Sequence, residues 1–131
     1  MPRHAAGTFD VTVKPIDAYA KDQAGLGRMS IDKQYHGDIE ATAKGEMLTG
    51  MTDIKTSGVY VAVERVTGTV QGKSGSFILH HTGLMTRGEQ SLTITVVPDS
   101  GTGQLVGLTG KLGITITPDG KHAYTFDYTL P

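Results

Sequence analysis

The feature that most constrains the fold is a pair of long apolar segments, residues 59–70 and 74–85, that only a few residues separate. β-Branched and other apolar side chains dominate both segments, and such sequences favour strands. The Gly-Lys dipeptide at 72–73 is typical of a two-residue type II′ turn, with glycine at the first central position. The sequence therefore predicts an antiparallel hairpin in which Gln71 pairs with Ser74.

In this register, one face of the hairpin is apolar except for a carboxylate and an imidazole near its centre. Side chains alternate between the two faces of a strand, so a slip of one residue would move every side chain to the other face. On the apolar face, Glu64 is expected to face His81. The other pairs expected on this face are Gly68 with Phe77, Val66 with Leu79, Ala62 with Gly83 and Tyr60 with Met85.

A second turn selects the same face. The Arg-Gly dipeptide at 87–88 predicts a pairing of Thr86 with Glu89, which brings a third strand, residues 91–97, alongside the hairpin. His81 then lies beside Ile94. Because two separate loops choose one apolar face, the predicted register is consistent across three strands.

The remaining sequence contains further strand signals, and no segment predicts a helix. A Pro-Asp-Gly run at 118–120 is typical of a type I turn followed by a G1 bulge, and it pairs Thr117 with Lys121. One strand is unusual in having the small residues Ala41, Ala43 and Gly45 on one face. The eight expected strands are residues 7–14, 27–35, 39–48, 59–70, 74–85, 91–97, 111–117 and 122–130.

Sequential hairpins that each have one apolar face predict an all-β fold. At 131 residues the chain is expected to form one domain, residues 1–131. We predict an eight-stranded antiparallel up-and-down barrel, because closure removes the edges that an open sheet would expose, with a two-sheet sandwich as the alternative. In the barrel, the connections at 15–25 and 49–57 frame one mouth, and the connection at 98–110 covers the other end.

Composition excludes several classes of function. The formal net charge is −1 and the basic residues are scattered among acidic ones, so nucleic acid is not an expected partner. The chain has no cysteine, which rules out disulfides, thiolate metal sites and a cysteine nucleophile. The sequence contains no leader-like or membrane-length apolar stretch and no cofactor motif. We therefore expect a cytoplasmic protein that binds neither a membrane nor a cofactor.

The chain contains the motifs RMSIDKQYHGD at 28–38, KGEM at 44–47, ERVTG at 64–68, GSF at 75–77, VPDSGTG at 97–103 and GKH at 120–122. These motifs resemble those of a bacterial family of uncharacterised proteins placed among the allene-oxide-cyclase-like barrels. The resemblance covers nearly the whole chain and implies an eight-stranded barrel and a homo-oligomer. It implies no catalytic residue, because fold does not imply function and no motif carries over the chemistry of plant allene oxide cyclases.

Glu64 and His81 form the candidate catalytic pair. A carboxylate beside an imidazole inside a barrel stabilises the imidazolium and can serve as a general acid and base. The alternative is a structural polar pair that fixes the register. We favour this alternative over catalysis, because purely structural pairs of ionisable residues also shift the pKa values of their members.

Apolar side chains on the same inner face are expected either to line a ligand cavity or only to fill the barrel, whose interior admits side chains or one small ligand. The first interpretation is a barrel that holds a small apolar or amphipathic molecule oriented by Glu64 and His81. The alternatives are a cofactor-free isomerase, cyclase or lyase that uses this pair, and a structural oligomer with a filled barrel. The candidate ligand-binding residues are Tyr60, Phe77, Leu79, Met85, Tyr124 and Phe126.

The opposite face of the central hairpin is too apolar for a free barrel, and it predicts a homo-oligomer interface. The alternative is ordinary exposed apolar scatter. The interface residues are expected to be Val61, Val63, Arg65, His80 and Leu84.

Charged residues near the turn at 36–38 include Lys33, His36, Asp38 and Glu46. Two metal-ligating residue types on one loop, without a third at strand spacing, are a weak metal signal. We therefore interpret these residues as solvated charges and predict no metal site.

Overall fold

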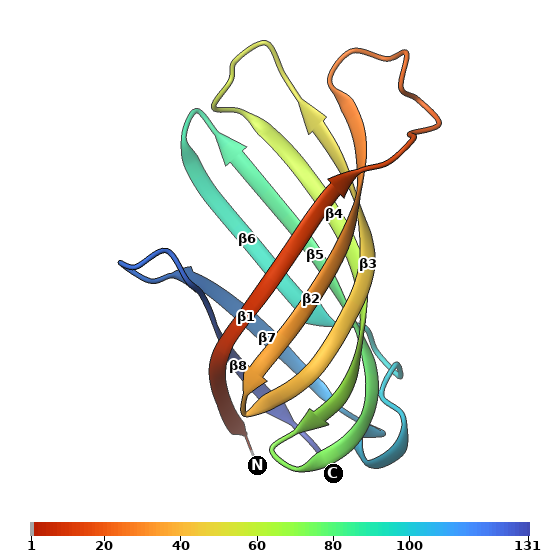
Figure 1. Cartoon of the computed structure of the whole chain (residues 1–131), viewed down its shortest axis with the longest axis vertical. Coiled ribbons are helices and arrows are strands. Elements are labelled where there is room, and N and C mark those ends of the chain that lie inside the picture. The colour runs from red at the N-terminus through yellow and green to blue at the C-terminus, as the bar shows by residue number, and fades with distance from the viewer. Residues whose placement is uncertain (1) are drawn as a thin grey trace.

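The computed structural model describes residues 2–131 as a closed antiparallel barrel of eight strands (Figure 1). Each strand pairs with its neighbour in sequence, and β1 pairs with β8, which confirms the predicted all-β up-and-down architecture. The elements are β1 (Arg3–Pro15), β2 (Leu26–Gly37), β3 (Ile39–Met51), β4 (Gly58–Val70), β5 (Lys73–Thr86), β6 (Glu89–Val96), the 3-10 helix η1 (Gly103–Leu105), β7 (Thr109–Ile116) and β8 (His122–Thr129).

The two ends of the barrel differ. The β1–β2, β3–β4 and β5–β6 connections lie together at one end, while the β4–β5 turn and the β6–β7 connection lie at the other (Figure 1). Leu105 and Leu108, both in the β6–β7 connection, are each 1% exposed and belong to the core cluster. This connection therefore plugs one end and leaves the other as a mouth, as the sequence predicts.

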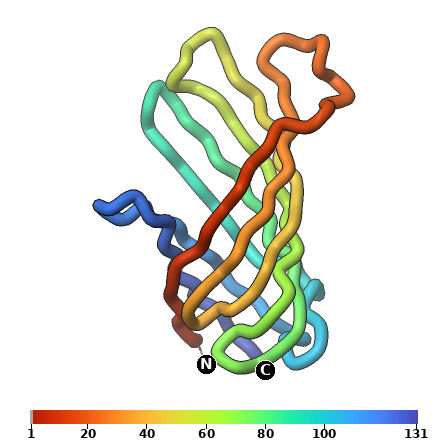
Figure 2. The backbone as a smooth tube through the Cα atoms, in the orientation of Figure 1, coloured from red at the N-terminus to blue at the C-terminus, as the bar shows by residue number. Residues whose placement is uncertain are grey.

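The barrel wall is complete only near the plugged end. Among the described residues, the β6–β7 ladder holds the single pair Thr95–Lys111, and β8 pairs with β1 only as far as Phe9. Residues 10–15 of β1 and 89–94 of β6 therefore have no strand partner on these sides. Figure 2 shows the β7–β8 hairpin leaving the wall at this level. The mouth half of the lumen is consequently open to the side as well as to the end.

The predicted register holds for two hairpins and is wrong for the central one. Thr86 pairs with Glu89, and Thr117 and Lys121 close the last hairpin, both as predicted. In the β4–β5 hairpin, however, Val70 pairs with Lys73, and Glu64 lies opposite Leu79 instead of His81.

The cause of this difference is the turn. Gln71 and Gly72 both have positive φ, 46° and 85°, which is the geometry of a type I′ turn with these two residues at its centre. The prediction placed Gly72 at the first central position of the turn, whereas it occupies the second. Pairing moves by two residues as a result, so every side chain stays on its predicted face and Glu64 becomes a diagonal neighbour of His81.

The plugged half of the lumen is filled by side chains. Phe126 is stacked between Phe77 and Tyr128, with ring centroids 5.9 and 5.0 Å away. Leu79 and Ile94 belong to the same core cluster and are fully buried. The core thus fills one half of the barrel, and the candidate functional site lies where this core ends.

Candidate functional site

A buried ionic cluster lies where the packed core ends. The carboxylate of Glu64 on β4 is its centre and is completely buried. Lys33 Nζ donates to Oε2 at 2.8 Å, and the Tyr35 hydroxyl donates to Oε1 at 2.6 Å. His81 Nε2 also lies 2.6 Å from Oε2. It approaches off the line of its N–H bond, so this contact is an ion pair or dipole contact rather than a hydrogen bond.

Small residues on β3 allow this cluster to form. Lys33 and Tyr35 lie on β2, Glu64 lies on β4, and β3 runs between them. Gly45 pairs with Glu64, and a methyl group added to Gly45 would lie 2.7 Å from the Glu64 Cα. Ala43 pairs with Lys33 on the other side. Because the residues on the inner face of β3 have small side chains or none, Lys33 and Tyr35 reach across β3 to the Glu64 carboxylate.

The surroundings of Glu64 keep it ionised. Burial alone raises the pKa of its carboxyl group, but the contacts with His81 and Lys33 outweigh burial and lower the pKa to about 2. Burial and the nearby Glu64 charge together raise the pKa of Tyr35 well above its ordinary value, so Tyr35 remains a donor. The Lys33 ammonium also lies over the Phe9 ring, 4.9 Å from its centroid. The cluster is therefore a compensated ion pair with every carboxylate oxygen contacted.

Tyr60 connects the cluster to the mouth. Its hydroxyl lies 3.4 Å from Nδ1 of His81. Burial and the Glu64 charge raise the pKa of Tyr60, so its hydroxyl is neutral under ordinary conditions. The Tyr60–His81–Glu64 series thus runs from the half-buried ring down to the fully buried carboxylate.

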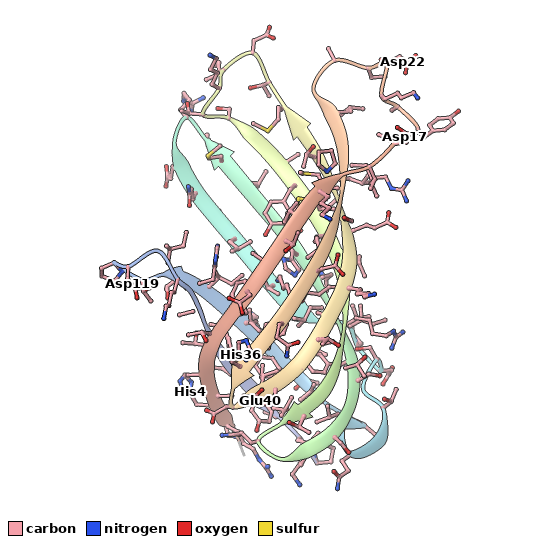
Figure 3. All side chains as sticks on the ribbon, viewed as in Figure 1. His4, Asp17, Asp22, His36, Glu40 and Asp119 are labelled. Atoms are coloured by element: carbon pink, nitrogen blue, oxygen red, sulfur yellow. The ribbon has the colours of Figure 1, made fainter. Side chains whose placement is uncertain are left out.

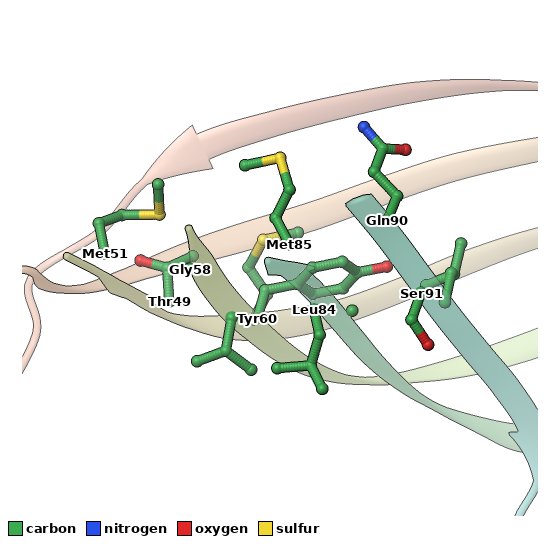
Figure 4. A pocket seen from close by; sticks show the side chains of 12 residues that line it. Thr49, Met51, Gly58, Tyr60, Leu84, Met85, Gln90 and Ser91 are labelled. Atoms are coloured by element: carbon green, nitrogen blue, oxygen red, sulfur yellow. The ribbon is translucent and has the colours of Figure 1, made fainter. Parts of the chain in front are cut away.

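Above this level lies a cavity of about 360 Å³ whose lining is mainly apolar. Figure 4 shows the Tyr60 ring extending across it, with Met51 and Met85 on one side and Gln90 and Ser91 on the other. Its lining residues are Met47, Thr49, Met51, Gly58, Val59, Tyr60, Gly83, Leu84, Met85, Gln90, Ser91 and Leu92.

The six candidate ligand-binding residues separate into two groups. Tyr60 and Met85 line the cavity. Phe77, Leu79, Tyr124 and Phe126 are buried in the core cluster. The Tyr124 hydroxyl accepts from the Ile39 amide at 2.8 Å and donates to the His36 carbonyl at 3.0 Å, so it holds the β2–β3 turn.

Sequence reasoning missed two members of the cluster, Lys33 and Tyr35. The interpretation of Lys33 as a solvated charge is wrong, since its side chain is only 5% exposed. The signal was present, because Lys33 has the same parity along β2 as the apolar residues Met29 and Ile31.

The rest of the proposed turn cluster does not converge on one point. His36 contacts Asp10 and, at 4.0 Å, Glu40, whereas Glu46 pairs with Arg28. Asp38 accepts from the Ala6 amide. Figure 3 shows His36 and Glu40 near the plugged end, far from Asp17 and Asp22 at the mouth. Within residues 2–131, no group of three or more histidine and acidic side chains is arranged to hold a metal ion.

The predicted interface residues lie on the outer face of β4 and β5. Val63 is 55% exposed, and Val61, Arg65, His80 and Leu84 are exposed as well. A surface groove of about 780 Å³ runs along this face between Tyr19, Leu48, Val63 and His80. Among the described residues, no helix is long and apolar enough to cross a membrane.

Comparisons with known proteins identify relatives of the whole chain. Residues 5–128 match a family described as "Protein of unknown function (DUF3224)". A crystal structure of a protein of unknown function from that family, from Shewanella oneidensis MR-1, superposes with a TM-score of 0.94 at 44% sequence identity. The match covers 100% of this chain and 98% of that one. A search among curated proteins finds no match.

Both descriptions name the family without reference to allene oxide cyclases, so that label stays a prediction. The resemblance to a family of uncharacterised proteins is matched by both comparisons, which span nearly all of the barrel, whereas the homo-oligomer that it implies stays a prediction. Since the family match extends from the first strand into the last, the chain belongs to the DUF3224 family.

Proposed function

We propose that the barrel binds a small apolar or amphipathic molecule in the cavity at its mouth, with Tyr60 as the polar group at the cavity floor. The observation that carries this proposal is the contrast between the two halves of one lumen. One half is filled by stacked aromatic rings, whereas the other keeps an apolar cavity of about 360 Å³. Such a concave, mainly apolar site with few polar groups is typical of small-molecule binding.

The side chains around the cavity support an adaptable site. Met47, Met51 and Met85 all contribute to its lining. Methionine side chains are unbranched and polarisable, so they adjust to ligands of different shape and contact aromatic rings favourably. A flat apolar molecule with one polar group suits this lining. The allene-oxide-cyclase-like label enters this proposal only as a fold relationship.

A matched pair of charge substitutions tests the proposal. Met85→Glu places a carboxylate in the cavity, whereas Val106→Glu places one on the exposed β6–β7 connection at the other end. A neutral apolar fluorophore, N-phenyl-1-naphthylamine, is titrated into each protein. We expect saturable binding to the wild type and to Val106→Glu, and at least about tenfold weaker binding to Met85→Glu, since burying an unpaired charge is costly. Equal affinity for all three proteins would refute the site.

One observation favours a second candidate, a cofactor-free isomerase, cyclase or lyase. The Tyr60–His81–Glu64 series links the cavity to a buried carboxylate. With its pKa lowered to about 2, Glu64 is a poor proton acceptor near neutral pH, so its role would be to orient His81. His81 and Tyr60 would then exchange the proton with a substrate.

This second candidate has its own test. A panel of small enols, epoxides and esters is assayed with the wild type and with Glu64→Gln, which keeps the shape of the side chain. A turnover that falls with Glu64→Gln and follows the charge of His81 supports catalysis. Turnover that is unchanged in Glu64→Gln would refute this role of Glu64, and absence of turnover in the wild type would leave binding as the function.

We also propose that the outer face of β4 and β5 packs against a second copy of the chain. Val61, Val63 and Leu84 are exposed there and form an apolar surface on adjacent strands. Apolar patches of this kind are uncommon on monomers, and association through one self-complementary face is the usual way to cover them.

A further inference from the structure

Tyr60 occupies a position that couples the cavity to the ionic cluster. It lines the cavity, and its hydroxyl lies 3.4 Å from Nδ1 of His81. The other ring nitrogen of His81, Nε2, lies 2.6 Å from the Glu64 carboxylate. A hydroxyl both donates and accepts, so the direction of its bond with His81 decides what it offers on its other side.

Neutral His81 fixes one direction. The Glu64 carboxylate is ionised, and a bare Nε2 lone pair 2.6 Å from its oxygen would be repelled, so the single ring proton of a neutral imidazole belongs on Nε2. Nδ1 is then a bare acceptor, and the Tyr60 hydroxyl donates its proton to it. The lone pairs of the hydroxyl remain for the cavity. In this state Tyr60 offers a ligand an acceptor.

Protonated His81 fixes the opposite direction. Both ring nitrogens then carry protons, so Nδ1 must donate to the Tyr60 oxygen. The tyrosine proton turns away from His81 and is free for the cavity. In this state Tyr60 offers a ligand a donor.

We infer that the charge of His81 selects the hydrogen-bonding class of the ligand, an inference that rests on the proposed binding function. With His81 charged, the cavity prefers small aromatic or aliphatic molecules whose polar group only accepts, such as ketones and esters. With His81 neutral, it prefers molecules of the same size whose polar group donates, such as N–H heterocycles.

The groups that face His81 support assigning this behaviour to it. On β4 they are Glu64, ionised because its pKa is lowered to about 2, and Tyr60, neutral because its pKa is raised. From β2, the Lys33 ammonium contacts the same carboxylate oxygen. The residue opposite on β6 is the apolar Ile94. Within this cluster, protonating His81 changes the net charge from zero to plus one.

Two uncharged probes of similar size test the inference. Indole only donates and acetophenone only accepts, and neither titrates between about pH 5 and 8. Their affinities for the wild-type protein are measured by calorimetry across this range. Because the chain contains no tryptophan, indole emission gives a second, independent readout. We expect the ratio of indole affinity to acetophenone affinity to rise about tenfold from the acidic to the basic end, the value of one hydrogen bond.

Tyr60→Phe is the decisive variant, because it removes only the hydroxyl and leaves His81 and Glu64 in place. Both probes should bind this variant with a ratio that does not change with pH. Thr93→Val, which removes an exposed hydroxyl on the outer face of β6, is the control and should retain the wild-type profile.

The outcomes separate this inference from the function on which it rests. A pH-independent ratio in the wild type, or an unchanged profile in Tyr60→Phe, overturns the inference while binding stands. Failure of both probes to bind the wild type at any pH overturns the inference, and if N-phenyl-1-naphthylamine also fails to bind, the proposed function falls as well.

Discussion

Tyr60 lies directly opposite Gly83 in the β4–β5 ladder, and its ring covers the glycine. A methyl group added to Gly83 would lie 2.6 Å from Cδ1 of the Tyr60 ring, closer than two carbon atoms can approach. An aromatic ring over a cross-strand glycine is a known way of stabilising a sheet. Here the same arrangement holds the Tyr60 hydroxyl between the cavity and His81, so one glycine sets the geometry of the candidate site.

Gly83→Ala is therefore expected to displace Tyr60. Overpacking at this position should lower the free energy of unfolding by about 1–3 kcal/mol, measured by urea denaturation. The change should also weaken binding of N-phenyl-1-naphthylamine in the cavity. Gly50→Ala is the matched control, because it lies on the outer face of β3 near the mouth, where the nearest atom is a Val59 methyl at 3.2 Å. Equal effects of the two substitutions would contradict this account of Gly83.

The contributions of Lys33 and Glu64 to the free energy of unfolding should be coupled. Removing one partner leaves a buried charge without compensation, so Lys33→Met and Glu64→Gln are each expected to cost about 3–5 kcal/mol of stability. The double variant should cost clearly less than the sum of the two, because it leaves neither charge behind. Denaturation of the four proteins completes the cycle. Additive losses would show that the pair is not coupled.

Side-chain parity explains how far the sequence predicts this site. The sequence predicted a type II′ turn centred on residues 72–73, whereas the structure has a type I′ turn at Gln71 and Gly72, because the sequence Gln-Gly-Lys fits either turn. The resulting shift of two residues preserved the faces, so Glu64 and His81 were placed correctly inside the barrel. Their direct opposition was wrong, since turn geometry alone decides it.

Other features depend on contacts that no local pattern contains. The start of β1 at Arg3 follows from its pairing with β8, and residues 3–6 have little strand propensity of their own. Lys33 looked like a surface charge because lysine is rarely buried. Its partner Glu64 is on β4, and β3 lies between the two strands with only the small residues Ala43 and Gly45 on its inner face. The side opening of the mouth half arises because the short β7–β8 hairpin stops pairing with β6 and β1, which a sequence pattern does not measure.

Acid should reveal the contribution of Glu64 to stability. The folded state lowers the pKa of this carboxyl from 4.5 to about 2, so its stabilising contribution is complete above pH 4.5 and is lost as the pH falls through 2. The total is about 3 kcal/mol. The difference in unfolding free energy between wild type and Glu64→Gln should shrink by this amount across that window. A difference that stays constant from pH 5 to about pH 2 would rule out a lowered pKa.

The outer face of the central hairpin should mediate self-association. Val63→Glu places a charge in the middle of the exposed apolar surface and should convert an oligomer into a monomer in sedimentation experiments at micromolar concentration. Thr125→Glu adds the same charge to the exposed face of β8 and should leave the assembly unchanged. A wild-type protein that is monomeric at this concentration would contradict the proposal.

The most direct test of the central claim is a crystal structure of the protein grown with acetophenone. We expect the ligand in the cavity between Met47 and Met85, with its carbonyl oxygen within hydrogen-bonding distance of the Tyr60 hydroxyl. A cavity that remains free of ligand at saturating concentration, or one that Tyr60 and the surrounding methionines close with their own side chains, would contradict the claim. The ionic cluster would then serve only to stabilise the barrel.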